Sequence, residues 1–183
     1  LLISEQQLEG DSILSHYRLP IPIPTYLSAI AASDYETIAY THDGANGPVD
    51  VELHVKATQL TQMETRFQNL GEVIDGLEYW FGPYIWNKVG YVTTTVGAME
   101  HATNITYPIY AANGSLSNES LMAHELGHMW WGDNVTCQTD GDMWINEGWA
   151  SFSVYLFYEA VYGRDAYEQT MMNELRYMLQ FGH

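Results

Sequence analysis

The sequence predicts an α+β fold in which strands lead and helices follow. Residues 49–55 alternate apolar and polar side chains, which is the pattern of a half-buried strand. From residue 60 onward the apolar side chains recur every three or four positions, the period of a helix, and helical patterns dominate after residue 120. Because 46% of the residues are apolar, the chain has enough material for a buried core.

The first part of the chain, residues 1–55, has the character of strands and turns. A proline-punctuated stretch at 19–24 is expected to be extended, and residues 26–40 are rich in β-branched and aromatic side chains. Glycine, asparagine and proline gather at 42–48, which predicts a turn. The alternating strand at 49–55 follows directly.

The middle of the chain is expected to be a helical segment followed by two strands. Apolar residues keep helical spacing over residues 60–80, with a break at Gly71. Residues 91–96 are β-branched and predict a strand, and a second short strand is expected at 105–110.

Helices are expected over most of the remaining chain. Capping residues precede a helical pattern at 121–131, and Gly132 is a natural stop. Another helix is expected from about 146 to 162, ending at Gly163. A sequence typical of a capping box at 165–168 opens the last helix.

Charge and composition exclude several classes of function. The net charge is −17, so the chain repels phosphate backbones and anionic lipid, and we expect neither nucleic acid nor a membrane surface as partner. A cationic ligand fits better, although a soluble acidic surface alone also explains this charge. No apolar run reaches the ~18–20 residues of a membrane span. Cys137 is the single cysteine, which excludes an internal disulfide and a four-thiolate zinc site.

A zinc site is predicted from His124, Glu125 and His128 inside the helical pattern at 121–131. Histidines at positions i and i+4 lie on one helix face, so both imidazoles can reach one ion. Glu125, beside the first ligand, is placed to take a proton from an attacking water. Catalytic zinc needs a third protein ligand, and Glu147 at the start of the next predicted helix can supply it, leaving the fourth position open.

Two histidines one turn apart also occur as ordinary core or surface residues, and the later glutamate on a separate helix strengthens the zinc interpretation. Four other histidines are not expected to be ligands. Three of them lie in turn-like or terminal contexts, and one lies on the polar face of its strand; these residues are His16, His42, His183 and His54.

The motifs together resemble the M1 family of zinc aminopeptidases, whose catalytic domain is thermolysin-like. The family signature is HExxH followed by a glutamate after 18 residues, which the predicted site matches position by position. The family also carries Gly-x-Met-Glu-Asn shortly before the zinc helix, and this chain has Gly97-Ala-Met-Glu-His101 there. The flanks agree as well, at Trp130–Gly132, Val135–Thr136 and Trp144–Gly148.

The resemblance implies substrate-binding roles in the stretch before the zinc helix. Glu100 is expected to bind the free amine of a peptide, and Gly97 and Ala98 are expected on an edge strand that pairs with the substrate backbone. His101 replaces the usual asparagine, so it is expected in the same subsite with altered specificity. One zinc ion per chain is implied as the cofactor.

The resemblance also implies that the chain is a central slice of a longer protein. Residues 1–55 are expected to be the last strands of a β-rich domain, and residues 56–183 the first half of the catalytic domain. In the family a tyrosine about 60 residues after the third ligand stabilises the oxyanion. The tyrosines between Tyr155 and Tyr177 are too early for that role, so the fragment alone could be inactive.

The predicted function is therefore zinc-dependent removal of the first residue of peptides with a free N-terminus. A zinc endopeptidase of the same core fold, which would ignore Glu100, is one alternative. A zinc-retaining peptide-binding module without turnover is another, and hydrolysis of a lipid epoxide is a related family activity. Acidity and few lysines suggest an exported bacterial protein.

Overall fold

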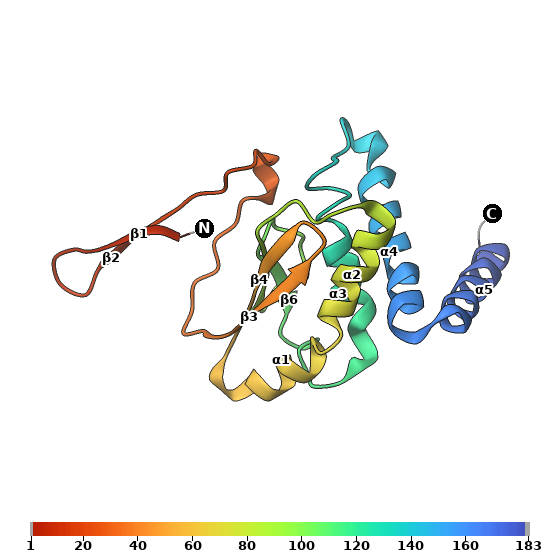
Figure 1. The fold of residues 1–183 in the computed structure, drawn as a ribbon, viewed down its shortest axis with the longest axis horizontal. Helices are drawn as coiled ribbons and strands as arrows, with labels where there is room; N and C mark the ends of the chain where they lie inside the picture. Colours follow the sequence, from red (N-terminus) through yellow and green to blue (C-terminus); the bar gives the residue numbers. More distant parts are fainter. Residues whose placement is uncertain (1, 182–183) are drawn as a thin grey trace.

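The computed structural model describes residues 2–181 and has three parts in a row (Figure 1). A hairpin of β1 (Leu2–Gln7) and β2 (Ile13–Tyr17) projects from one end. A four-stranded sheet lies in the middle, and helices α2 (Leu70–Phe81), α3 (Glu119–Gly127) and α4 (Trp144–Tyr162) lie together on one side of it. The last helix, α5 (Arg164–Phe181), lies at the end opposite the hairpin.

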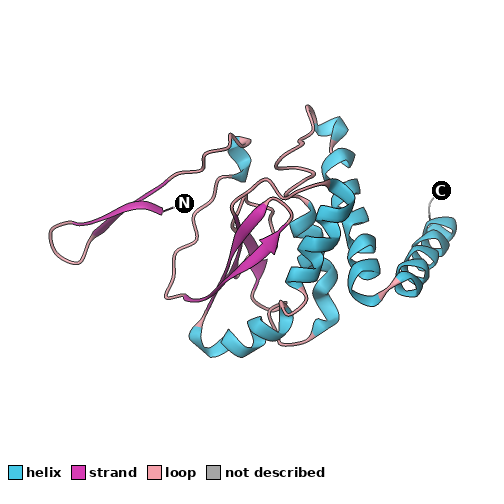
Figure 2. Ribbon diagram, viewed as in Figure 1, coloured by secondary structure: helices cyan, strands magenta, loops and turns pink. Residues whose placement is uncertain are grey.

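The central sheet has the strand order β3-β4-β5-β6 and is mixed. Its strands are β3 (Glu36–Gly44), β4 (Gly47–Val55), β5 (Lys88–Thr94) and β6 (Ile105–Pro108). The pair β3–β4 is antiparallel, whereas β4–β5 and β5–β6 are parallel. Parallel pairing requires long crossovers, and helices lie between β4 and β5 along the chain. Figure 2 shows the helices in cyan beside the magenta strands of this sheet.

The predicted alternation in β4 is confirmed, because its apolar side chains are buried while its polar ones are half-buried or exposed. The apolar residues lie in one core with the buried faces of α2 and α3. Phe67 lies at its centre, in edge-to-face contact with Tyr91 at 4.5 Å and with Tyr107 at 5.2 Å between ring centroids.

The helices that follow are α1 (Leu60–Arg66), α2 (Leu70–Phe81), α3 (Glu119–Gly127) and α4 (Trp144–Tyr162). Short 3-10 turns lie at Thr25–Leu27, Ala57–Gln59, Leu116–Asn118 and Asp140–Asp142. Helix α4 packs against both α2 and α3, so it holds the helical layer together. Gly163 ends α4 with a φ of 86°, as predicted.

Several predicted boundaries were wrong for reasons of tertiary structure. The helix at 60–80 breaks at 67–69, and Gly71 lies inside α2, where a Cβ would stand 3.3 Å from the His42 ring of β3. The predicted turn at 42–48 narrows to residues 45–46, because strand pairing continues to Gly44 opposite Gly47.

The helix expected at 121–131 starts earlier and ends at Gly127. Residues 128–130 continue as tighter turns, with bonds such as Trp130 N–H to Gly127 O at 3.1 Å. The two later strands cover 88–94 and 105–108 instead of 91–96 and 105–110.

The predicted division at residues 55 and 56 stays a prediction, but the sheet crosses it. Strand β3 pairs with β4, β4 pairs with β5, and β4 and β5 share one core, so the sheet favours a boundary ahead of β3. Among residues 2–181 no helix combines the length and apolar character needed to cross a bilayer. His183 lies outside the described residues.

Candidate metal centre

Helices α3 and α4 bring His124, His128 and Glu147 to one point. The Nε2 atoms of the two histidines are 3.1 Å apart. The Oε2 atom of Glu147 lies 3.3 Å from Nε2 of His124 and 3.7 Å from Nε2 of His128. Within residues 2–181 this is the group of three histidine, cysteine or carboxylate side chains that are close enough together to hold a metal ion. The sequence-predicted ligand set is thus assembled in space.

The distances among these three atoms fit one zinc ion. Zinc bonds to nitrogen and oxygen are about 2.0–2.2 Å long, so neighbouring ligand atoms of a tetrahedral site stand roughly 3.3–3.5 Å apart. The observed separations of 3.1, 3.3 and 3.7 Å bracket that range. His128 is buried, whereas the side chain of Glu147 is 53% exposed, so the site opens to solvent on the Glu147 side.

The backbone orients His128. Its Nδ1 lies 3.0 Å from the carbonyl oxygen of Trp131, which can only accept, so Nδ1 carries the proton and Nε2 is free for a metal. Gly132 follows with a φ of +141°, and a Cβ there would stand 3.1 Å from Nδ1. The glycine that the sequence indicated as a helix stop therefore also leaves room for the ligand.

The first histidine is held in its neutral form. Burial, together with the neighbouring His128, lowers the pKa of His124 below its usual value. A neutral imidazole is the form that binds zinc, so the environment favours the ligand state.

Glu125 lies in the same helix and is buried. Burial, together with Glu100 and Glu147, raises the pKa of its carboxyl to about 8. Among the described residues its Oε2 atom has no hydrogen-bond partner. This oxygen is therefore available to a molecule that enters the site, and a bound dication would lower the pKa because positive charge favours the carboxylate.

Glu100 is close enough to the site to raise the pKa of Glu125 and to oppose the lowering at His124. It follows Met99, which pairs with Thr106 of β6 through two backbone hydrogen bonds of 3.2 and 3.0 Å. This bridge fixes Glu100, which is buried, at the sheet edge.

The residues on either side of Met99 and Glu100 are not part of a regular strand. Gly97 and Ala98 precede the bridge and lie outside the paired strands, so their pairing with a substrate backbone stays a prediction. No neighbouring atom within 4 Å would meet a Cβ on Gly97. The Nδ1 atom of His101 is buried and has no hydrogen-bond partner among residues 2–181.

Helix α3 is tied to the sheet by buried hydrogen bonds. The Tyr91 hydroxyl of β5 donates to the carbonyl oxygen of Met122 at 2.9 Å. The indole of Trp86 donates to the carbonyl oxygen of Met129 at 2.9 Å. These bonds flank the two histidines along the chain, so the ligands are held by the core.

Two features near the site were missed in the sequence. Asp133 is buried, neither carboxylate oxygen has a partner among the described residues, and burial together with Glu100 and Glu125 raises its pKa to about 8. Asn146 accepts from the Cys137 N–H at 3.0 Å and donates to the Tyr26 hydroxyl at 3.3 Å. The sequence signal for each was its position, since Asp133 directly follows Gly132 and Asn146 directly precedes Glu147.

The other described histidines are not part of the metal group. His42 bonds Asp75 at 2.8 Å, and His54 lies 3.4 Å from Glu52. His16 and His42 lie in β2 and β3, which corrects their expected turn contexts.

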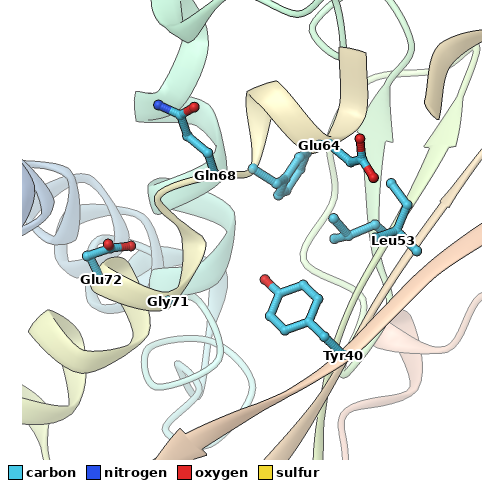
Figure 3. A pocket seen from close by; sticks show the side chains of 8 residues that line it. Tyr40, Leu53, Glu64, Gln68, Gly71 and Glu72 are labelled. Carbon is cyan, nitrogen blue, oxygen red and sulfur yellow. The ribbon is translucent and has the colours of Figure 1, made fainter. Parts of the chain in front are cut away.

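One surface hollow of the described residues lies away from the predicted metal ligands. A pocket of about 300 Å³ lies between β3 and helices α1 and α2, where Tyr40, Glu64 and Glu72 line it (Figure 3). It includes none of the three predicted metal ligands.

Comparison with known proteins agrees with this fold. Residues 62–181 match the model of the peptidase family M1 domain. Glutamyl aminopeptidase of Bos taurus is 29% identical over 168 residues, which are 83% of this chain and 17% of that protein. Leucine aminopeptidase 2-2 of Meyerozyma guilliermondii is 33% identical over 168 residues, which are 88% of this chain and 25% of that protein.

A solved structure matches nearly the whole chain. An M1 zinc metallopeptidase from Deinococcus radiodurans shares the fold with a TM-score of 0.82 and 25% identity, covering 99% of this chain and 41% of that one. The chain thus spans about a quarter or less of these two curated relatives. The family match includes all of α3 and α4, which carry the three predicted ligands. By this match the chain belongs to peptidase family M1.

Proposed function

We propose that this protein is a zinc-dependent aminopeptidase, which releases the first residue of peptides that have a free N-terminus. The observation that carries the proposal is the convergence of His124, His128 and Glu147 at separations that suit one tetrahedral zinc ion. The names of the relatives support it, since the two curated proteins are a glutamyl and a leucine aminopeptidase.

The proposed chemistry assigns the proton transfers to Glu125. Zinc held by the three ligands supplies Lewis-acid activation at the open position. The Oε2 atom of Glu125, buried and without a partner among the described residues, accepts a proton from the attacking water. The same carboxyl then delivers that proton to the amine that leaves.

Glu100 is proposed to make the enzyme an exopeptidase. A buried carboxylate pairs strongly with an ammonium, and a continuing peptide chain at this point would leave it unpaired. The bridge at Met99 holds Glu100 in place, so the substrate amine defines which bond reaches the metal. Gly97, Ala98 and His101 complete this end of the subsite, and the unpartnered Nδ1 of His101 is available to a substrate.

Two alternatives differ in what they do with a peptide. An endopeptidase cuts within the chain and has no need of the free amine. A zinc-retaining module binds peptides without turnover. Both retain the three metal ligands, so the reaction products decide among them.

The test is mass-spectrometric mapping of a peptide mixture, in which each peptide is supplied with a free and with an acetylated N-terminus. The chain is tested beside any longer form of the protein that contains it. Stepwise loss of first residues from the free peptides alone is the expected result. Internal cuts in both sets would refute the aminopeptidase and support the endopeptidase. Peptide binding by every zinc-loaded form without any cleavage would support the binding module.

A further inference from the structure

Helices α3 and α4 touch through a position that has no side chain. A Cβ built on Gly127 would stand 2.6 Å from the hydroxyl oxygen and 2.7 Å from the Cβ of Ser153, and 3.3 Å from the Cα of Ala150. Both partners are fully buried. The Ser153 hydroxyl donates to the Trp149 carbonyl within its own helix at 2.8 Å, so it is held in place.

Gly127 lies within one turn of both predicted histidine ligands, and its partners on α4, Ala150 and Ser153, come three and six residues after Glu147. On α3, Gly127 directly precedes His128 and comes three residues after His124. On α4, Ala150 comes three residues after Glu147, which is about 4.5 Å along the helix axis. The distance between the two helices at this point therefore sets how far the carboxylate stands from the imidazoles.

We infer that Gly127 is a positioning residue of the metal centre. Its missing side chain allows α4 to approach α3 to the distance at which Glu147 completes the site with the two histidines. The inference rests on the proposed zinc site. It assigns a role to a residue that touches neither metal nor substrate.

The expected size of the effect follows from the contact distances. A methyl group at Gly127 must move about 0.8–0.9 Å away from Ser153 to reach ordinary contact near 3.5 Å. Metal–ligand distances tolerate only about 0.2 Å. Glu147 is half exposed and can follow part of the movement, so we expect zinc affinity to fall about 10–100-fold rather than vanish.

The experiment measures zinc affinity of the full chain by competition with a chelating dye, together with the visible spectrum of the cobalt-loaded protein. Gly127→Ala should weaken zinc binding and alter the cobalt spectrum, which reports ligand geometry. Ser153→Gly removes the atoms that the new methyl group would meet. The double variant Gly127→Ala/Ser153→Gly should therefore bind zinc to within about threefold of Ser153→Gly alone. A threefold difference is small beside the 10–100-fold loss expected for Gly127→Ala.

A second glycine, at the contact between α2 and α4, provides a matched control. A Cβ on Gly76 of α2 would stand 2.7 Å from the Cβ of Ala160, which lies more than three turns beyond Glu147 on α4. Gly76→Ala should lower thermal stability and leave zinc affinity unchanged. An equal loss of zinc affinity in Gly76→Ala and Gly127→Ala would overturn the inference, because the effect would not be local.

The outcomes separate this inference from the proposed function. Failure of the unmodified chain to bind zinc contradicts the metal site itself. Normal zinc binding by a folded Gly127→Ala contradicts only the positioning role. If Gly127→Ala does not fold, the double variant decides: recovery of fold and affinity supports the role, and recovery of fold without affinity refutes it.

Discussion

Shortening the third ligand by one methylene tests the metal centre without removing charge. In Glu147→Asp the carboxylate retreats by about 1.5 Å, the length of one carbon–carbon bond. The observed separation of 3.3 Å from Nε2 of His124 would then open well beyond the ~3.3–3.5 Å that a tetrahedral ion allows. We expect the carboxylate to leave the metal while both histidines stay.

The loss in affinity can be estimated from known zinc sites. Structural sites with four protein ligands bind zinc with about 10–16 kcal/mol, or roughly 2.5–4 kcal/mol per ligand. Loss of one ligand should therefore weaken zinc binding by about two to three orders of magnitude. The side chain is 53% exposed, so the free energy of unfolding of the zinc-free chain should change by no more than about 0.5 kcal/mol.

Competition with a chelating dye measures the affinity, and circular dichroism confirms the fold. Glu159→Asp is a matched control, since this glutamate lies on the same helix and pairs with Arg164 at 3.1 Å instead of the metal ligands. The control should bind zinc like the unmodified chain. Unchanged zinc affinity in Glu147→Asp would refute the assignment of this residue as third ligand.

Three further predictions address catalysis, anchoring and pH. Glu125→Gln should keep zinc affinity within a few-fold and lower turnover of a free peptide at least ~10²-fold, as measured by product release; retained turnover contradicts the general-base role. Tyr91→Phe removes the bond to the Met122 carbonyl and should cost about 0.5–1.5 kcal/mol in urea unfolding; no change would mean that this bond does not anchor α3. Burial, with a further contribution from Lys88, lowers the pKa of His54. The contribution of neutral His54 to the free energy of unfolding is therefore complete above about pH 6.5 and is lost as the pH falls through the folded-state pKa. His54→Gln should therefore lose less thermal stability than the unmodified chain between pH 7.5 and 5.5, and an equal loss would contradict the shift.

The fold was predictable where local pattern and packing agree. Strand β4 alternates along its whole length because one face meets the helices, and that alternation is visible in the sequence. Gly71 misled the prediction because glycine usually breaks a helix. Here it lies in the first turn of α2, beside the His42 ring of β3, so the helix starts just ahead of the glycine instead of breaking at it. The β1–β2 hairpin has exposed residues on both faces and so gave no burial pattern to detect.

The candidate site likewise contains residues that a local pattern predicts and residues that depend on tertiary structure. Histidines at i and i+4 are a local pattern, so His124 and His128 were predictable, and the carboxylate of Glu147 followed from its place at the next helix start. Asp133 was not predictable, because its burial depends on how the loop after α3 folds back, with the Asp133 N–H bonded to the carbonyl oxygen of His128 at 3.0 Å. The role of Gly127 also depends on tertiary structure, because the packing of Ser153 against this position is what leaves no room for a side chain.

The carboxylates around the site give a physical reason for the two cationic ligands of the proposal. Apart from burial, the pKa of Glu125 is raised by Glu100 and Glu147, and that of Asp133 by Glu100 and Glu125. With these raised pKa values, the carboxyls of Glu125 and Asp133 favour the neutral form near pH 7 unless positive charge is added nearby. In the proposed function, a zinc ion among the metal ligands and a substrate ammonium at Glu100 would supply that charge at two different points. An aminopeptidase therefore suits these electrostatics better than an endopeptidase, whose substrate brings no ammonium to Glu100.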